Sequence, residues 1–540
     1  MGHGIDASAV ASAPPRSAGG ETLLLVAALI LIWLAATAWA RPLLLPDEGR
    51  YVGVAWEMLR SGDWLVPTLN GLPFLHKPPL FYWITAVSMA LFGDNAWAAR
   101  AAPLLGAWLS AVALYLFVRR WAGERHARMT VLALLTQPLF YIGGQFANLD
   151  MLVAGCITAT IVLLAHAALC RERGLPHDDA LLAAYALAAL GVLAKGLIGV
   201  ALPALVVLAW LVTLRRWHLL RSLLSLRGAA LFSIVAAPWF VLMQRAFPDF
   251  LHYFFVEQQV RRFAGSGFNN VQPVWFYPAV LLLFTLPWLP WLHRLLLRGV
   301  PAASKPSPLR RLMWLWIAVV VLFFSLPQSK LIGYVLPAVP PLAFLFAESL
   351  LAPGVPSVRA RRLWWTSAAI ASAASLAAVA IFAIDPQRST RELAAALEAG
   401  RAAHEPVFML GRYAYDLPFY ARLTEPVSVV EDWQRPEARE HDDWRKELLD
   451  AAQFAGAGRA ASILIEPAAL PVALCRSLVS WVIGPAGASA TYPYLAQAVR
   501  VATRRGNTVW RLDAARPAVA RALGCAVEPR AAPNEAPPSA

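Results

Sequence analysis

Charged residues are scarce in this chain. Only 15% of its 540 residues are charged, whereas 59% are hydrophobic. A soluble globular protein usually has about 25% charged residues. The shortage of charge therefore argues against a soluble protein and indicates a chain that meets lipid over much of its surface.

Cysteines are few, and cofactor motifs and repeats are missing. Four cysteines are too few for a small scaffold held together by disulfides. The sequence has neither a P-loop nor a Rossmann glycine pattern, so it offers no nucleotide-binding fingerprint. It also has no obvious internal repeat of the kind that many secondary transporters carry.

Long apolar runs are abundant. Each is about 18 residues or longer and lacks internal charge, which suits a hydrocarbon core of about 30 Å. Clear examples are residues 23–40, 101–118, 151–168, 197–214 and 363–384. The first run is too long for a signal peptide and is read as a retained span. The runs predict a polytopic α-helical membrane protein with about 11 spans, in a range of about 11 to 13.

The basic residues predict the orientation. The formal net charge is +14, and arginines cluster between apolar runs, at 119–128, 171–173, 215–227, 294–311 and 359–362. Cytoplasmic loops of membrane proteins are rich in lysine and arginine. We therefore expect a bacterial inner-membrane protein with a cytoplasmic N-terminus, and no nucleic-acid partner. Loop 41–100 and everything after about 385 would face outward, with the short apolar segment 78–92 lying on the outer face.

The chain divides into four parts by composition. Residues 1–20 and 527–540 are predicted to be disordered, the first of them cytoplasmic. Residues 21–384 form the multispanning part. Residues 385–526 read as a periplasmic α/β domain with strands near 406–410, 426–430 and 461–466. Cys475 and Cys525 would share that domain in an oxidising compartment, and we predict a disulfide between them.

Polar residues are concentrated in loop 41–100. Pro46, Asp47 and Glu48 predict the start of a helix with Asp47 as its N-cap. The helix should end at Ser61-Gly62. Its charged residues fall on one side, so the residues alone leave two interpretations open, an amphipathic surface anchor or part of a functional site.

An ordered set of motifs favours the second interpretation. PDEGRY (46–51) is followed by SGDWLVPTLNG (61–71), KPPLFYW (77–83), FGDNAWAAR (92–100), NLDM (148–151) and SKLIGYVLP (329–337). This series resembles the lipid-carrier-dependent, multispanning glycosyltransferases of GT-C type. The bacterial aminoarabinose transferases acting on lipid A resemble it most, and the protein O-mannosyltransferases are relatives. The resemblance covers residues 23–350.

The resemblance implies an inverting transfer of a sugar from a polyprenyl phosphate, such as undecaprenyl phosphate, outside the cytoplasmic membrane. Such a transfer needs a base for the acceptor and cations for the leaving phosphate. Asp47 matches the family's catalytic acidic position and Asp150 the second one. The residues assigned to the donor phosphate are Arg50, Lys77, Arg262, Lys330, Tyr51, Tyr82 and Tyr334. Lys195 is interpreted instead as reaching the lipid headgroups.

Two positions depart from the aminoarabinose transferases. His76 stands where they usually have glutamate, and Gln258 follows Glu257 where they usually have histidine. His76 and Glu257 could still hold a divalent metal, with the histidine and the acidic residue exchanged between the two positions. The question of a metal therefore stays open, and no cofactor is assigned. The same departures put aminoarabinose in doubt as the sugar.

The sequence thus predicts a membrane glycosyltransferase. Its partners would be a polyprenyl phosphate–sugar donor and an acceptor such as lipid A, another envelope glycan or a protein. A transporter or flippase of lipid-linked sugars is the alternative, but the charges gather in outer loops rather than in mid-span. A structural assembly protein would leave the ordered loop motifs unexplained.

Overall fold

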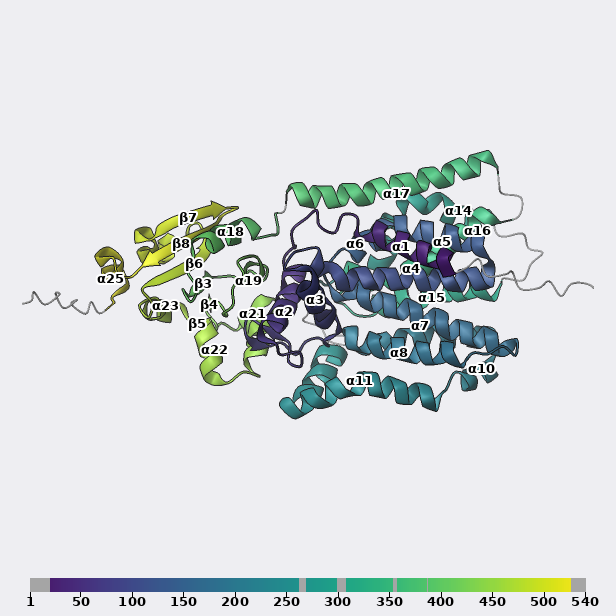
Figure 1. The fold of residues 1–540 in the computed structure, drawn as a ribbon, viewed down its shortest axis with the longest axis horizontal. Helices are drawn as coiled ribbons and strands as arrows, with labels where there is room; N and C mark the ends of the chain where they lie inside the picture. Colours follow the sequence, from purple (N-terminus) through teal and green to yellow (C-terminus); the bar gives the residue numbers. More distant parts are fainter. Residues whose placement is uncertain (1–19, 262–268, 299–306, 353–356, 386, 526–540) are drawn as a thin grey trace, which may run out of the picture.

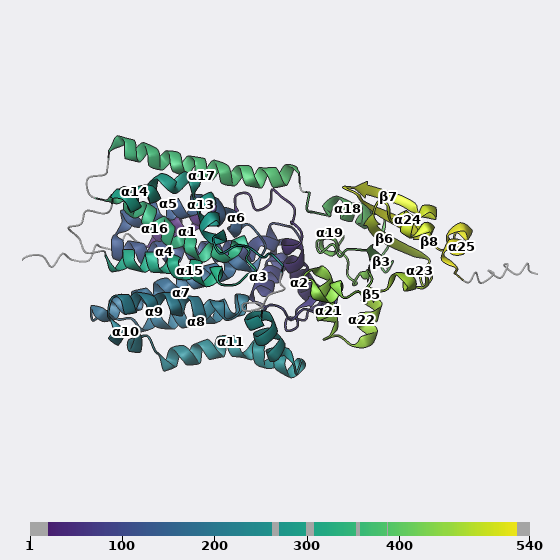
Figure 2. The same ribbon diagram turned by 180° about the vertical axis from the view of Figure 1, so that it is seen from behind.

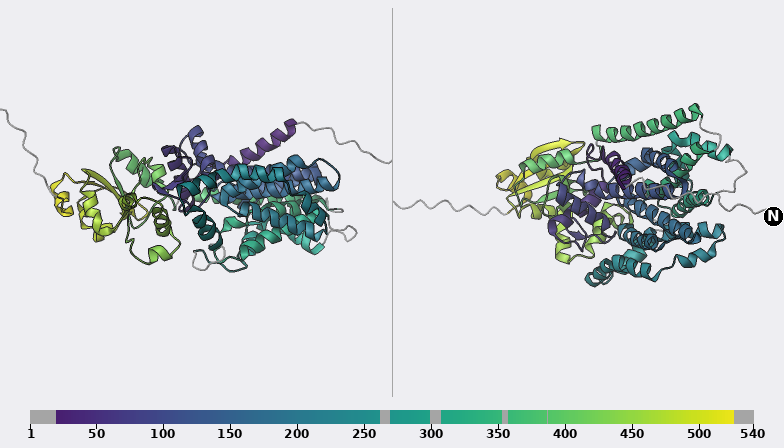
Figure 3. Two further views of the ribbon diagram at one scale, coloured as in Figure 1. Left: turned by 90° about the horizontal axis from the view of Figure 1, so that it is seen from below. Right: turned by 45° about the vertical axis from the view of Figure 1, so that its right-hand side comes forward.

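A helical bundle and a smaller α/β domain make up the computed structural model (Figure 1). The structure describes residues 20–261, 269–298, 307–352, 357–385 and 387–525. The predicted disordered ends, 1–20 and 527–540, lie outside this part of the chain except for Gly20. Figures 2 and 3 show the bundle and the α/β domain at opposite ends of the molecule, with α2 and α3 between them.

The bundle is built from helices of unequal length. Its members are α1 (Gly20–Ala35), α4 (Ala101–Ala122), α5 (Glu124–Thr136), α6 (Pro138–Gly144), α7 (Leu149–Glu172), α8 (Asp178–Lys195), α9 (Ile198–Thr213), α10 (Trp217–Ser222), α11 (Leu226–Ala246), α13 (Phe276–Phe284), α14 (Leu289–Arg298), α15 (Pro308–Ser325), α16 (Val339–Leu351) and α17 (Val358–Ile384). In the views of Figures 1 and 2, α17 runs along one side of the bundle and α11 along the other.

Fewer helices are long and apolar enough to cross a membrane than the sequence predicted. Among the described residues there are 6, or up to 7 if the bent pair around Thr285 forms one span. The predicted 11 spans are not confirmed, because the other helices are too short or carry too many charges to qualify. Helix α1 stops at Ala35, α9 has 16 residues, and α8 contains Asp178, Asp179 and Lys195. The chain is nevertheless a multi-pass membrane protein.

Helix α7 lies at the centre of the bundle and carries Asp150 in its first turn. It packs against α4 and α8. Gly155 of α7 meets Gly106 of α4 so closely that a Cβ on either residue would collide with the other helix's backbone. Small residues allow this close approach between helices in a membrane, and the approach fixes where the first turn of α7 stands.

Loop 41–100 forms two helices above the bundle. Helix α2 (Asp47–Ser61) ends at Gly62, as predicted, and α3 (Leu80–Phe92) has 13 residues, too short for an upright span. A short hairpin of β1 (Thr68–Leu69) and β2 (Leu72–Pro73) joins them. The two helices pack against each other, and α2 also contacts the α/β domain.

The C-terminal region contains a six-stranded sheet in the order β5-β4-β3-β6-β8-β7. The strands are β3 (Val407–Leu410), β4 (Ser428–Val430), β5 (Leu464–Ile465), β6 (Val479–Pro485), β7 (Val499–Arg504) and β8 (Asn507–Asp513). Strands β3 to β6 pair in parallel, whereas β8 pairs antiparallel with β6 and β7. The first three strands lie where the sequence predicted strands.

Short helices surround that sheet: α18 (Arg391–Gly400), α19 (Leu417–Tyr420), α20 (Glu437–Glu440), α21 (Trp444–Ala452), α22 (Ala457–Ile463), α23 (Leu470–Leu474), α24 (Ala488–Thr491) and α25 (Pro517–Leu523). The predicted disulfide is confirmed, since Cys475 after α23 is bonded to Cys525 after α25. Of these helices, α19 packs against α2, and α21 packs against the β1–β2 hairpin.

Candidate active site

A cavity of about 710 Å³ lies where the bundle, loop 41–100 and the α/β domain meet. The bundle and loop 41–100 contribute Asp47, Arg50, Tyr51, His76, Lys77, Asp150, Lys195 and Tyr334. The α/β domain contributes Arg412, Tyr413, Tyr415, Asp442, Asp443, Trp444 and Glu447. Residues far apart in the chain thus form one polar chamber rich in charged side chains.

The sequence predicted Asp47 as the N-cap of α2, and this prediction is wrong. Pro46 occupies the cap position, and Asp47 lies in the first turn, where a carboxylate still interacts favourably with the helix dipole. Its side chain pairs with Arg50, one turn on. The carboxylate is 28% exposed and lines the cavity, so it is accessible to a substrate.

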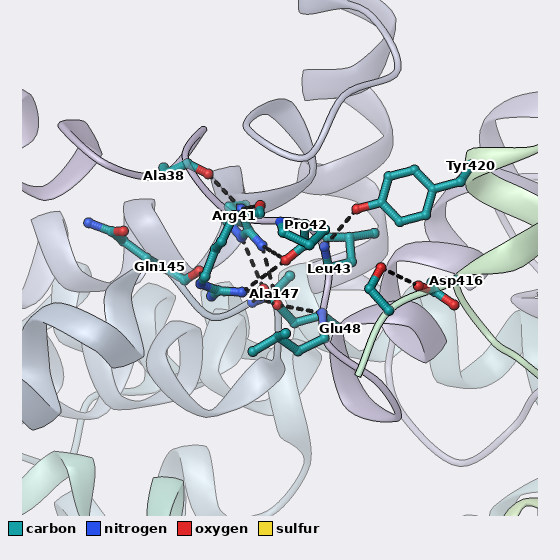
Figure 4. A network of polar contacts seen from close by, with 12 residues as sticks. Ala38, Arg41, Pro42, Leu43, Glu48, Gln145, Ala147, Asp416 and Tyr420 are labelled. Carbon is teal, nitrogen blue, oxygen red and sulfur yellow. Dashed lines mark hydrogen bonds and ion pairs between the residues drawn. The ribbon is translucent and has the colours of Figure 1, made fainter. Parts of the chain in front are cut away.

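A buried ion network surrounds Glu48, the residue that follows Asp47 in the chain (Figure 4). Glu48 is fully buried and binds both Arg41 and Arg100, the latter at 3.0 Å from Nε to Oε1. Burial pushes the pKa of Glu48 upward, but the charges of Arg100 and Arg41 outweigh it and bring the pKa to about 2. Glu48 therefore stays ionised between two buried cations.

The same carboxylate also orients Asp150. The backbone N–H of Ala147 donates to Glu48 Oε1 at 2.9 Å, and Arg41 donates to the carbonyl of Gln145 at 2.8 Å. Asn148 then caps α7 by accepting from the backbone N–H of Asp150. One buried glutamate thus links the start of α2 to the start of α7, the two places that carry the candidate acids.

Lys195 lies in the cavity, contrary to its interpretation as a lysine that reaches the lipid headgroups. Its ammonium pairs with Asp150 and lies 4.1 Å from the centre of the Tyr334 ring, a cation–π contact. Lys195 is the last residue of α8, and the packing of α8 on α7 brings it to Asp150.

The α/β domain closes the other side of the chamber. Glu447 of α21 pairs with Arg50, and the Tyr415 hydroxyl donates to the same carboxylate. The backbone N–H of Leu43 donates to the Tyr420 hydroxyl at 2.6 Å, and Asp416 accepts from Ser389 and Thr390 (Figure 4). Sequence reasoning missed these residues because no local motif marks them.

Two of the predicted phosphate-binding residues do not line the chamber, and a third cannot be placed relative to it. Lys330 is 4% exposed and donates to the backbone carbonyls of Gln272, at 2.9 Å, and Pro327, so it holds a loop together. Tyr82 is fully buried on α3 and lies outside the cavity lining. Arg262 lies outside the described residues.

The two residues predicted for a metal have other neighbours. His76 stacks on Phe74, with ring centres 4.4 Å apart, and approaches Asp450 to 4.0 Å. Glu257 pairs with Arg261 at 2.7 Å. In the described part of the chain, no group of three or more histidine, cysteine or acidic residues could hold a metal ion. These side chains do not form a metal-binding set.

Comparison with solved structures shows the fold that this chain shares. ArnT from Cupriavidus metallidurans, solved bound to undecaprenyl phosphate, matches with a TM-score of 0.76 at 23% identity. That match covers 91% of this chain and 98% of the solved one, and the apo form gives a TM-score of 0.74. The resemblance identified from the sequence is thereby confirmed at the level of the fold.

Sequence relatives agree with the fold. Residues 76–242 match the family model described as dolichyl-phosphate-mannose-protein mannosyltransferase. Two curated relatives named undecaprenyl phosphate-alpha-4-amino-4-deoxy-L-arabinose arabinosyl transferase come from Shewanella sediminis (34% identical over 58% of this chain) and Aeromonas salmonicida (35% over 57%). The chain spans about half the length of these relatives, 56% of each.

Proposed function

We propose that this protein is an inner-membrane glycosyltransferase. It moves a sugar from a polyprenyl phosphate, such as undecaprenyl phosphate, to an envelope acceptor such as lipid A. The observation that carries the proposal is the chamber itself, in which Asp47 and Asp150 stand together with Arg50, Lys77 and Lys195. The names of the relatives and the lipid bound to the solved homologue support the same chemistry.

The proposed reaction follows from these groups. An acceptor oxygen attacks the anomeric carbon as the bond from that carbon to the phosphate oxygen breaks, which inverts the configuration. Asp47 takes the acceptor's proton, and the cations stabilise the charge that develops on the departing phosphate. Burial raises the pKa of Tyr51 to about 12, so its hydroxyl remains a neutral hydrogen-bond donor toward that phosphate.

Lys195 and Asp150 have a linked role in this proposal. The ion pair holds Lys195 against Asp150, and Lys77, which lines the same chamber, is proposed to contact the donor phosphate directly. Asp150 would orient Lys195 and serve as the second acid of the site. Lys330 is removed from the proposed site because its ammonium is occupied by two backbone carbonyls.

The orientation is part of the proposal. The six long apolar helices and the bent pair give seven crossings. Four more are added if α1, α8, α9 and the pair of α5 with α6 each cross the membrane, which makes 11, an odd number. A cytoplasmic N-terminus then places the chamber and residues 385–526 in the periplasm. The Cys475–Cys525 disulfide supports this side, because disulfides persist in oxidising compartments.

The test is transfer in detergent from a polyprenyl phosphate–sugar, combined with donor-binding measurements. Asp47→Asn should lower turnover by about 100-fold or more, the usual scale for a lost general base, while donor binding survives. Lys77→Ala should weaken donor binding as well as turnover, since a charge facing the phosphate is lost.

Asp94→Asn is the matched control, because Asp94 is an exposed aspartate of the same loop outside the chamber. It should leave both measurements unchanged. Near-normal turnover in folded Asp47→Asn would remove Asp47 from the mechanism and make Asp150 the base to test next.

A further inference from the structure

A second cavity, of about 900 Å³, adjoins the candidate active site. It lies between the outer end of α17, the segment leading into α18 and the sheet residues of β3, β6 and β8. Pro46, Arg388 and Arg412 line both cavities. The two spaces therefore share a border directly beside Asp47, and we call the second one the basic cavity.

The lining of the basic cavity is strongly cationic. It carries the arginines Arg388, Arg391, Arg412, Arg504 and Arg505 but only one acidic residue, Glu392. Arg504 pairs with Glu392 and Arg505 with Asp385. Among the described residues, the side chains of the other three arginines have neither an ion pair nor a hydrogen bond. Three guanidinium groups are thus available to an anion.

One side of the basic cavity is formed by the end of a candidate membrane-spanning helix. Ala383 and Ile384, the last residues of the span α17, form part of its lining, and Ile384 is 85% exposed. Pro42 and Leu45 add further apolar surface. A lipid lying in the outer leaflet could place its head group in this cavity while its chains stay in the bilayer.

We propose that the basic cavity binds the phosphorylated head group of the acceptor lipid. The free arginines hold its phosphate, because the guanidinium fork matches phosphate geometry. The acceptor oxygen then reaches past Pro46 to Asp47 and to the donor in the first chamber. This inference rests on the proposed function and adds to it a place for the acceptor, in a cavity that neither Lys77 nor Lys195 lines.

The size of the cavity supports a head group rather than a lone ion. About 900 Å³ lies in the range of pockets that hold whole small molecules, about 300–1,000 Å³. The border at Pro46, Arg388 and Arg412 leaves the head group next to the chamber instead of in it. Donor and acceptor head groups would thus occupy two adjoining cavities.

The experiment measures binding of lipid A, and of its phosphate-free form, to the full-length protein in detergent. Arg391→Ala should weaken lipid A binding by about 10-fold, the scale of one lost charge-assisted contact, and Arg391→Glu should weaken it further. Both variants should keep donor affinity, because Arg391 does not line the first chamber. Phosphate-free lipid should bind the wild type and both variants equally weakly.

Arg476→Ala is the matched control, since Arg476 is an exposed arginine of the α/β domain away from both cavities. Unchanged lipid A binding in Arg391→Glu would overturn the inference. Competition by phosphatidylglycerol as effective as that by lipid A would also overturn it, because the cavity would then accept any anionic lipid. Lost lipid A binding in the variants, together with a wild type that transfers no sugar, would support the acceptor site and refute the proposed function.

Discussion

Replacement of Glu48 by glutamine offers a sharp test of the buried network. Three donors converge on each oxygen: Arg41, Arg100 and Ala147 N–H on Oε1, and Arg41, Arg100 and Leu44 N–H on Oε2. An amide keeps only one acceptor oxygen, so its NH₂ group must face three donors. It also leaves two buried cations, Arg41 at 4% exposure and Arg100 at 0%, without a counter-charge.

The expected cost is a loss of about 3–5 kcal/mol in the free energy of unfolding, the scale for removing one partner from a buried ion pair. The pKa gives a similar magnitude. Holding the pKa of Glu48 at about 2 instead of 4.5 corresponds to about 3 kcal/mol of preference for the ionised form. Because the folded pKa is depressed, this contribution is complete above pH 4.5 and is lost as pH falls toward 2.

The assay is unfolding in detergent, followed from pH 7 to pH 3. Glu57→Gln on the same helix is the matched control. Glu57 is also a carboxylate of α2, but it accepts from neutral donors only, namely Thr68 Oγ1 and the backbone N–H groups of Asn70 and Gly71. Burial raises the pKa of Glu57, so its replacement should cost only about 1 kcal/mol.

Two outcomes would refute the reasoning. Equal losses for Glu48→Gln and Glu57→Gln would mean that the two arginines contribute nothing beyond neutral hydrogen bonds. A wild type whose stability between pH 5 and pH 3 falls no faster than that of Glu48→Gln would contradict the depressed pKa. If the reasoning holds, Glu48→Gln should also lower transfer, because the network fixes the starts of both α2 and α7.

The remaining predictions concern the α/β domain and the topology. Replacing Cys475 and Cys525 by serine opens a loop with a sequence separation of 50 residues and should destabilise that domain by about 4 kcal/mol; unchanged thermal unfolding would contradict this. A reporter active only outside the cytoplasm should work after residue 95 or 400 and be silent after residue 122. Activity after 122 with silence after 95 would mean that α3 crosses the membrane.

Local features were predictable wherever a single segment sets its own structure. The apolar runs predicted a multi-pass membrane protein, since burying such runs in lipid needs no knowledge of their neighbours. Helix α2 ended at Gly62 as expected, because glycine adopts the left-handed conformation that terminates a helix. Strands β3, β4 and β5 were likewise visible in short β-branched runs.

Other features depended on contacts between distant segments. The sequence placed Asp47 at an N-cap and Lys330 at a phosphate, because a residue's local pattern does not show which group its side chain will meet. Packing of α8 against α7 joined Lys195 to Asp150, and docking of the α/β domain supplied Glu447 to Arg50.

The sequence by itself therefore determined that this is a multi-pass membrane protein, where its helix α2 ends, and which motifs carry acids and cations. These properties follow from hydrophobic burial and backbone preference, which act within a segment. Only the tertiary structure decided which charges pair, which of them remain free in the basic cavity, and which segments border the chamber. Whether two charged side chains pair depends on the distance between them in the folded protein, and the sequence does not give that distance.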